Sequence, residues 1–239
     1  MKTLLVAFIL CLVCSAVVST TAVTLRPKQE YNKDIDMKKN VLKASGEAFN
    51  ESDDIQSVFD GMITSVYIDM DTGSVVSELT KDDKKIEVEI PDTIDQGGLS
   101  SRKKYTQIYL KKDSSGSIQN IILPITSKGL WSTMLGFIAL ESDARTVKGF
   151  SYYSHGETPG LGGEVDNPKW KAQWIGKKVY DEAGNPKIDV TKNNTGTVYE
   201  IDALSGATIT GDGVENSLHY WLSDHGYGKF LDKVKQGVL

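Results

Sequence analysis

The sequence predicts an α+β domain that follows a single membrane-spanning helix. Near its start the chain has an uncharged, mostly apolar run at residues 4–23. Its middle part is rich in β-forming segments separated by turn residues, which predicts strands connected as hairpins. Close to its end, residues 213–226 place apolar side chains at helical spacing. Because the predicted strands outnumber the helices and follow one another along the chain, we expect the α+β class.

The apolar run LLVAFILCLVCSAVVSTTAV has the length of a membrane span. A helix of about 20 residues is roughly 30 Å long, which is enough to cross the hydrocarbon core of a bilayer. A cleaved secretory signal is the alternative, but it would have a shorter apolar centre and a small-residue cleavage site. Val13 before Cys14 does not suit a lipid-attachment cysteine. We therefore expect an uncleaved anchor over residues 1–25 and a domain over residues 26–239.

The charges that flank the anchor favour neither orientation strongly. Lys2 lies on one side of the apolar run. On the other side, basic and acidic residues are mixed, namely Arg26, Lys28, Glu30, Lys33, Asp34 and Asp36. The count of basic residues alone slightly favours a cytoplasmic domain.

The segments after the anchor begin with a helix. Residues 28–47 are charged with spaced apolar positions, which predicts a short helix leading away from the membrane. Residues 57–76 predict strands joined by a turn at 71–73, and residues 80–104 predict a polar surface excursion.

A hairpin and another strand are expected next. Residues 104–125 contain two β-rich runs around the loop 112–117, which has the composition of a turn. Residues 146–155 predict a further strand that leads directly into a glycine-rich loop.

The last predicted element is a helix over residues 213–226. Its apolar face is formed by Val214, Leu218 and Trp221. Asp212, with Glu215 three residues later, predicts an N-cap, and Gly226 predicts the end of the helix.

Charge and cysteine content exclude several classes of function. The chain has 27 Lys and Arg against 32 Asp and Glu, a net charge of −5, whereas nucleic-acid-binding domains usually have a basic face. Both cysteines, Cys11 and Cys14, lie in the apolar run, so the domain has no disulfide, thiolate metal site or cysteine nucleophile. Their Cys-x-x-Cys spacing is compatible with metal binding or thiol redox chemistry, but two small residues in a membrane helix are the simpler interpretation.

The domain lacks the common catalytic motifs, including the nucleophile elbow, the zinc-protease helix and the Walker A loop. Its three histidines are His155, His219 and His225. His155-Gly156-Glu157 matches one half of a zinc deaminase signature, but the cysteine half is missing. We interpret His219 and His225 as surface or helix-end residues. No catalytic and no metal-binding residue is therefore predicted.

Three segments are dense in residues that favour a ligand. Residues 155–170 contain several glycines, which suit either close approach to a flat heterocycle or phosphate, or a plain surface loop. Residues 127–140 have apolar and aromatic side chains that suit a cofactor wall or core packing. Residues 202–208, DALSGAT, end in Thr208, which is either a helix cap or an exposed hydroxyl acceptor. No base is evident beside it, and a following helix N-terminus would favour the charge of a phosphate ester there.

These segments carry a family resemblance that covers nearly the whole chain. LPITSKGLWSTMLGF, SHGETPGLGGEVDNPKWKAQWIGKK and DALSGATITGDGVENSLHYWL resemble the C subunits of the sodium-translocating NADH:quinone oxidoreductase, a bacterial respiratory complex. The resemblance implies FMN bound to Thr208 through a phosphoester, attached by a flavin transferase that uses FAD as donor. Further cofactor-site residues that it implies are Ser205, Gly206, Ala207, His155, Glu157, Thr158, Gly160, Leu161, Gly162, Leu130, Trp131 and Ser132.

The resemblance also implies a role, partners and a location. The chain would relay single electrons within a complex whose other subunits oxidise NADH, reduce ubiquinone and export sodium. Its anchor would lie in the bacterial inner membrane with the domain in the periplasm, in spite of the basic residues after the anchor.

Three alternatives remain open. The G subunit of the related ferredoxin-linked ion-translocating complex shares E-T-P-G-L-G and S-G-A-T, although residues 123–134 and 161–178 favour the quinone-reducing complex. The second alternative is a membrane-anchored binding or assembly module without a cofactor. The third is a stand-alone flavin reductase, for which the sequence offers no substrate site.

Overall fold

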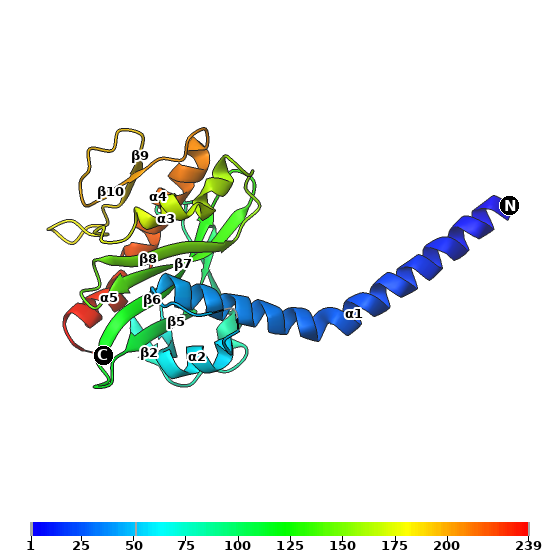
Figure 1. Cartoon of the computed structure of the whole chain (residues 1–239), viewed down its shortest axis with the longest axis horizontal. Helices are drawn as coiled ribbons and strands as arrows, with labels where there is room; N and C mark the ends of the chain where they lie inside the picture. Colours follow the sequence, from blue (N-terminus) through cyan, green and yellow to red (C-terminus); the bar gives the residue numbers. More distant parts are fainter. Residues whose placement is uncertain (1, 51, 239) are drawn as a thin grey trace.

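The computed structural model describes residues 2–50 and 52–238. A long N-terminal helix leads into a domain built on a six-stranded sheet (Figure 1). The α-helices are α1 (Lys2–Ala44), α2 (Ile55–Met62), α3 (Pro168–Ala172), α4 (Thr208–Leu222) and α5 (Gly228–Lys235). The strands of the large sheet are β1 (Ile63–Asp69), β2 (Ser74–Val76), β5 (Tyr105–Lys112), β6 (Ile118–Lys128), β7 (Thr133–Glu141) and β8 (Val147–Ser154). The predicted α+β class is confirmed.

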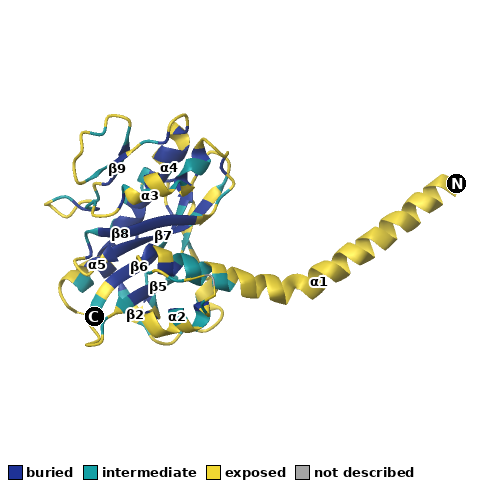
Figure 2. Cartoon of the chain, in the orientation of Figure 1, coloured by how far each residue is buried: buried dark blue, intermediate teal, exposed yellow. Residues whose placement is uncertain are grey.

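Helix α1 begins as an exposed apolar rod and ends packed on the sheet. Its first part is long and apolar enough to cross a membrane, and it is exposed throughout (Figure 2). Val41 and Leu42, near its end, are fully buried. The expected membrane helix and the expected helix at 28–47 are therefore one continuous element. It contains Pro27, which lacks an amide N–H, and proline is a common cause of bends such as the one in Figure 1. The domain boundary between residues 25 and 26 stays a prediction.

The large sheet is antiparallel and has helices on both faces. Its strand order is β2-β1-β5-β6-β7-β8, which confirms the hairpin expected at 104–125 and the strand expected at 146–155. Successive residues of a strand point to opposite faces. Ile122 thus packs in a cluster with Val41 and Leu42 of α1, whereas Ile121 joins the cluster that α4 and α5 complete on the other face. Burial on both faces explains the continuous apolar run at residues 121–125 of β6.

The remaining strands form two small sheets. β3 (Glu87–Glu89) pairs antiparallel with β4 (Ser101–Lys103), and a 3₁₀ helix, η1 (Asp83–Lys85), precedes them. This hairpin is mostly exposed, as expected of a surface excursion at 80–104. β9 (Asp189–Thr191) pairs parallel with β10 (Glu200–Asp202), and a second 3₁₀ helix, η2 (Gly162–Asp166), precedes α3.

The strand expected to start at residue 57 was wrong for its first part. Residues 57–62 belong to α2, and only from Ile63 does the chain continue as β1. The helix is capped by Asp54, whose side chain accepts the Gln56 N–H at 3.2 Å. Ile55 and Phe59, one helical turn apart, are buried against α1. Burial of this apolar pair against α1 outweighs the β preference of the short segment.

The start expected for the C-terminal helix was also wrong. α4 begins at Thr208, so Asp212 lies inside the helix instead of capping it. The N-cap residue is Ala207, which provides no side-chain cap, and the first turn is fixed by tertiary contacts described below. The apolar face through Val214, Leu218 and Trp221 is confirmed as buried. The helix ends at Leu222, four residues before Gly226, and the following α5 was not predicted.

Gly213 lets α4 lie directly on the end of β6. A Cβ atom at this position would lie 1.9 Å from the carbonyl oxygen of Lys128, a distance that real Cβ atoms do not reach. Gly61, in α2, is a helical glycine with open space around its Cβ position.

We expect Gly213→Ala to lower the free energy of unfolding by about 1–3 kcal/mol, because the new methyl group must push α4 away from β6. Gly61→Ala is the matched control. It should be neutral or stabilising by up to about 1 kcal/mol, because alanine favours the helix and meets no neighbour. Denaturant unfolding of the two variants and the parent measures both effects. Equal stabilisation by the two substitutions would contradict the close approach of α4 to β6.

Candidate functional site

The carboxylate of Glu157 lies where three segments of the chain meet. Glu157 follows the end of β8, and only 5% of its surface is exposed. Its oxygens accept hydrogen bonds from the backbone N–H groups of the loop between β6 and β7 and from a hydroxyl of α4. The donors are Leu130 N at 3.1 Å, Trp131 N at 2.9 Å, Ser132 N at 3.1 Å and Thr210 Oγ1 at 2.7 Å. One side chain thus joins the G-L-W-S loop, the glycine-rich loop and the first turn of α4.

These hydrogen bonds keep Glu157 ionised despite its burial. Burial alone raises the pKa of a carboxyl group, because a low-dielectric surrounding disfavours its charged form. The Thr210 hydroxyl and the amides of residues 130–132 act in the opposite direction, and together they hold the pKa of Glu157 below its ordinary value. The carboxylate therefore accepts hydrogen bonds from both sides at neutral pH.

Two glycines make room for this carboxylate. A Cβ atom at Gly129 would lie 2.4 Å from Oε1 of Glu157. A Cβ atom at Gly162 would lie 2.7 Å from Oε2 of Glu157 and 2.7 Å from Oγ1 of Thr210. The glycines of the two loops thus serve close packing around Glu157.

The DALSGAT segment forms a turn that presents Thr208 to solvent. Gly206 has a φ of +72°, a conformation that side chains other than glycine rarely adopt. Ser205 and Gly206 are exposed, whereas Ala207 is buried and attaches the turn to the core of the domain. Thr208 is the first residue of α4 and is exposed, which makes it a helix-start hydroxyl and not the cap. Because Ala207 has no capping side chain, the amides of the first turn are available to an anion.

The turn lies against the glycine-rich loop. The Cβ position of Gly206 is 3.0 Å from Cδ2 of Leu161. Large apolar side chains of the G-L-W-S loop, of the glycine-rich loop and of the first turn of α4 are exposed to solvent, namely Leu130 (50%), Trp131 (71%), Leu161 (44%) and Ile209 (58%). The three segments singled out in the sequence are therefore brought together, with an exposed hydroxyl beside an apolar surface.

The other predicted site residues lie in the glycine-rich loop. Thr158 is exposed, and its carbonyl accepts the N–H groups of Leu161 at 3.1 Å and of Gly163 at 2.9 Å. Gly160 has a φ of +76° and forms the exposed tip of this turn. His155 is partly buried and contacts Asp166 through Nε2 at 2.8 Å.

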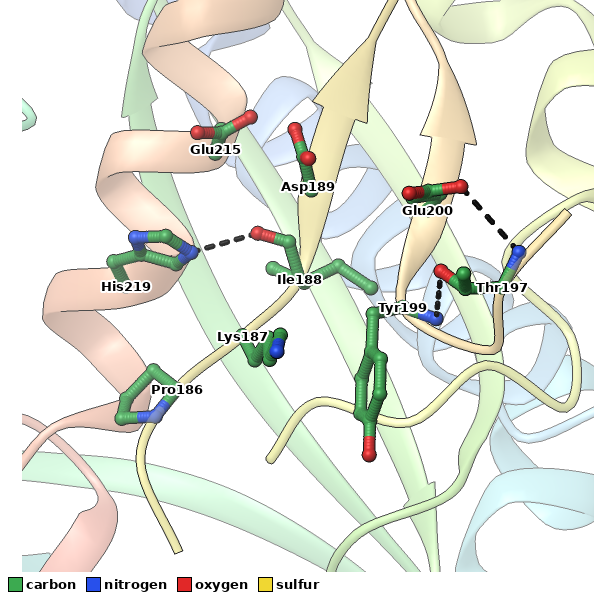
Figure 3. Close-up of a pocket in the computed structure, with 9 residues that line it drawn as sticks. All are labelled: Pro186, Lys187, Ile188, Asp189, Thr197, Tyr199, Glu200, Glu215 and His219. Carbon is green, nitrogen blue, oxygen red and sulfur yellow. Dashed lines mark hydrogen bonds between the residues drawn. The ribbon is translucent and has the colours of Figure 1, made fainter. Parts of the chain in front are cut away.

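A separate cavity of about 510 Å³ lies between α4 and the β9–β10 pair (Figure 3). Its carboxylates come from Asp189, Glu200 and Glu215, and none of the predicted cofactor-site residues lines it. Burial, with the nearby Asp189 carboxylate, raises the pKa of Glu215. His219 contacts the carbonyl oxygen of Ile188 at 2.7 Å and lies in the last turn of α4, in agreement with its interpretation as a helix-end residue.

Sequence reasoning missed this cavity, because its residues come from the segment 186–200 and from α4 and share no motif. Within the described residues, 2–50 and 52–238, no cluster of three or more His, Cys, Asp or Glu side chains is arranged to hold a metal ion.

The chain is similar to known proteins of one family. The FMN-binding domain family model matches residues 129–223, a range that includes residues 155–170, residues 202–208 and most of residues 127–140. The chain is 40% identical to the C subunit of the Na(+)-translocating NADH-quinone reductase of Yersinia pestis, over 100% of this chain and 94% of that protein. It is 41% identical to the C subunit of the same reductase from Vibrio anguillarum, over 100% of this chain and 96% of that protein.

Solved structures show the same fold. The crystal structure of Shewanella oneidensis NqrC matches with a TM-score of 0.76 and 28% identity, over 84% of this chain and 97% of that chain. The crystal structure of the reductase's C subunit from Parabacteroides distasonis matches with a TM-score of 0.67 and 25% identity, over 87% of this chain and 96% of that chain.

We expect Glu157→Gln to lower the free energy of unfolding by about 1–3 kcal/mol at neutral pH, because an amide cannot accept all the hydrogen bonds that the carboxylate accepts. The folded-state pKa of Glu157 is lowered, so its contribution is fully present above the unfolded value of about 4.5 and is lost as the pH falls toward the folded value. The stability difference between parent and variant should therefore shrink below about pH 4.5.

The control for this measurement is Glu78→Gln, which alters an exposed carboxylate after β2. Denaturant unfolding at a series of pH values compares the two variants with the parent. A stability difference for Glu157→Gln that stayed constant with pH, or one equal to that of the control, would refute the role of the ionised carboxylate.

Proposed function

The chain belongs to the family of C subunits of the Na⁺-translocating NADH-quinone reductase, and from this premise we propose that it carries FMN covalently on Thr208. The observation that supports this most strongly is the position of the Thr208 hydroxyl. It is exposed, it lies at the start of a 15-residue helix, and it follows a turn made of small residues. The hydroxyl is therefore accessible to a modifying enzyme.

The residues around Thr208 suit the two chemically different ends of FMN. The uncapped amides at the start of α4 favour the negative charge of a phosphate diester. Leu130, Trp131 and Leu161 offer exposed apolar surface for a flat ring system. FMN supplies one-electron transfer when bound, and the protein holds and orients it.

The attachment is a group transfer from FAD, catalysed by a flavin transferase. The Thr208 oxygen attacks the phosphorus of the FMN half, the bond between the two phosphates breaks, and AMP leaves. We assign the acceptance of the hydroxyl proton to a base of the transferase, since the sequence offers no base beside Thr208. Neither oxidant nor reductant is required.

A relay role agrees with the absence of catalytic motifs from the sequence. The electron-carrying subunit needs no acid, base or substrate pocket of its own, since NADH oxidation, ubiquinone reduction and sodium export belong to the complex as a whole. We place α1 in the bacterial inner membrane and the domain in the periplasm, where covalent attachment prevents loss of the flavin.

We expect Thr208→Ala to lose covalent flavin completely when the chain is produced together with the transferase, because the acceptor oxygen is gone. Ser205→Ala, which removes the other exposed hydroxyl of the turn, is the control and should retain it. Intact mass and flavin fluorescence in a denaturing gel measure the bound FMN. Covalent flavin on Thr208→Ala, or a colourless parent chain in the presence of active transferase, would contradict the assignment. The second result would favour a binding module without a cofactor.

A further inference from the structure

His155 is connected to the Glu157 backbone through its ring. The backbone N–H of Glu157 donates to Nδ1 of His155 at 3.2 Å. The other ring nitrogen, Nε2, lies 2.8 Å from Oδ2 of Asp166 at the end of η2. Only 14% of the histidine side chain is exposed, so the ring is held between these two groups.

The two contacts define one tautomer. Nδ1 accepts the amide N–H and therefore carries no proton, which leaves the proton on Nε2, where it is donated to the Asp166 carboxylate. Asp166 thereby orients the ring so that its accepting nitrogen faces the Glu157 amide. Since both nitrogens are engaged within the protein, neither is free for a flavin.

The preceding amide is fixed by a second side chain. Gly156 N–H donates to Oγ of Ser132 at 2.7 Å, and the same hydroxyl lies 3.4 Å from Oε1 of Glu157. The consecutive backbone N–H groups of Gly156 and Glu157 thus both donate to side chains, the first to Ser132 and the second to His155. Both hydrogen bonds therefore determine the direction in which the Glu157 side chain leaves the backbone.

We propose that His155 is a positioning residue, whose Nδ1 fixes the backbone of Glu157 and thereby the arrangement of the G-L-W-S loop and α4 around Thr208. This deepens the proposed function, because the loop that His155 acts on is the one assigned to the flavin ring. The action itself lies within the protein and does not depend on the flavin.

Two substitutions separate the two nitrogens of the ring. In His155→Asn the amide oxygen occupies the place of Nδ1 and accepts the N–H two residues later, as in an Asx turn, but the side chain no longer reaches Asp166. In His155→Gln the longer amide reaches toward Asp166 and cannot replace Nδ1 in the same conformation. If Nδ1 is the important group, asparagine restores the acceptor for the Glu157 N–H and keeps the loop in place, whereas glutamine does not.

The test uses the full-length chain produced together with the transferase, and it has two readouts. Hydrogen exchange of the amides of residues 130–132 should be within about twofold of the parent in His155→Asn and up to about tenfold faster in His155→Gln. The visible circular dichroism of the flavin should be parent-like in the first variant and altered in the second.

Any other pattern of hydrogen exchange overturns the proposal. Parent-like exchange in both variants would show that His155 does not position the loop. Faster exchange in His155→Asn alone would show that the contact with Asp166, and not Nδ1, is the important one. A parent chain without covalent flavin in the presence of active transferase would refute the attachment at Thr208, and the exchange rates would still decide the role of His155.

Discussion

The arrangement of the site depends on one buried carboxylate. Glu157 accepts hydrogen bonds from three consecutive amides of the β6–β7 loop and from the Thr210 hydroxyl, and these partners lie 25 to 27 and 53 residues away in the chain. A buried charge is costly unless it is satisfied in this way. All the hydrogen-bond partners of this carboxylate belong to the elements that surround Thr208. The hydrogen bonds that satisfy the buried charge therefore also hold these elements together.

Close backbone packing supports this interaction. Gly129 and Gly162 leave space for the carboxylate, and Gly213 lets α4 lie against the carbonyl of Lys128 at the end of β6. Larger residues at these positions would separate the elements that Glu157 connects. The result is a closely packed support for an exposed surface, where Thr208 and the apolar side chain of Trp131 are accessible from solvent.

The elements with strong local patterns could be predicted from the sequence. The apolar span, the hairpin at 104–125 and the buried face of α4 each follow from residue periodicity. The helix at α2 and the start of α4 at Thr208 could not, because both depend on contacts with distant parts of the chain. Glu157 was predicted from the sequence as a cofactor-site residue, and its contact with the cofactor stays a prediction. The hydrogen bonds of its carboxylate to the loop amides and to Thr210 could not be predicted, because the partners are distant in the chain.

The most direct test of the central claim is an experimental structure of the flavinylated full-length chain, determined within the assembled complex. We expect continuous density from Oγ1 of Thr208 into a phosphate, a flavin ring beside Trp131 and Leu161, and a Glu157 carboxylate that still binds the loop amides and Thr210. A flavin bound elsewhere, or a Glu157 side chain released from these partners when FMN is present, would contradict it.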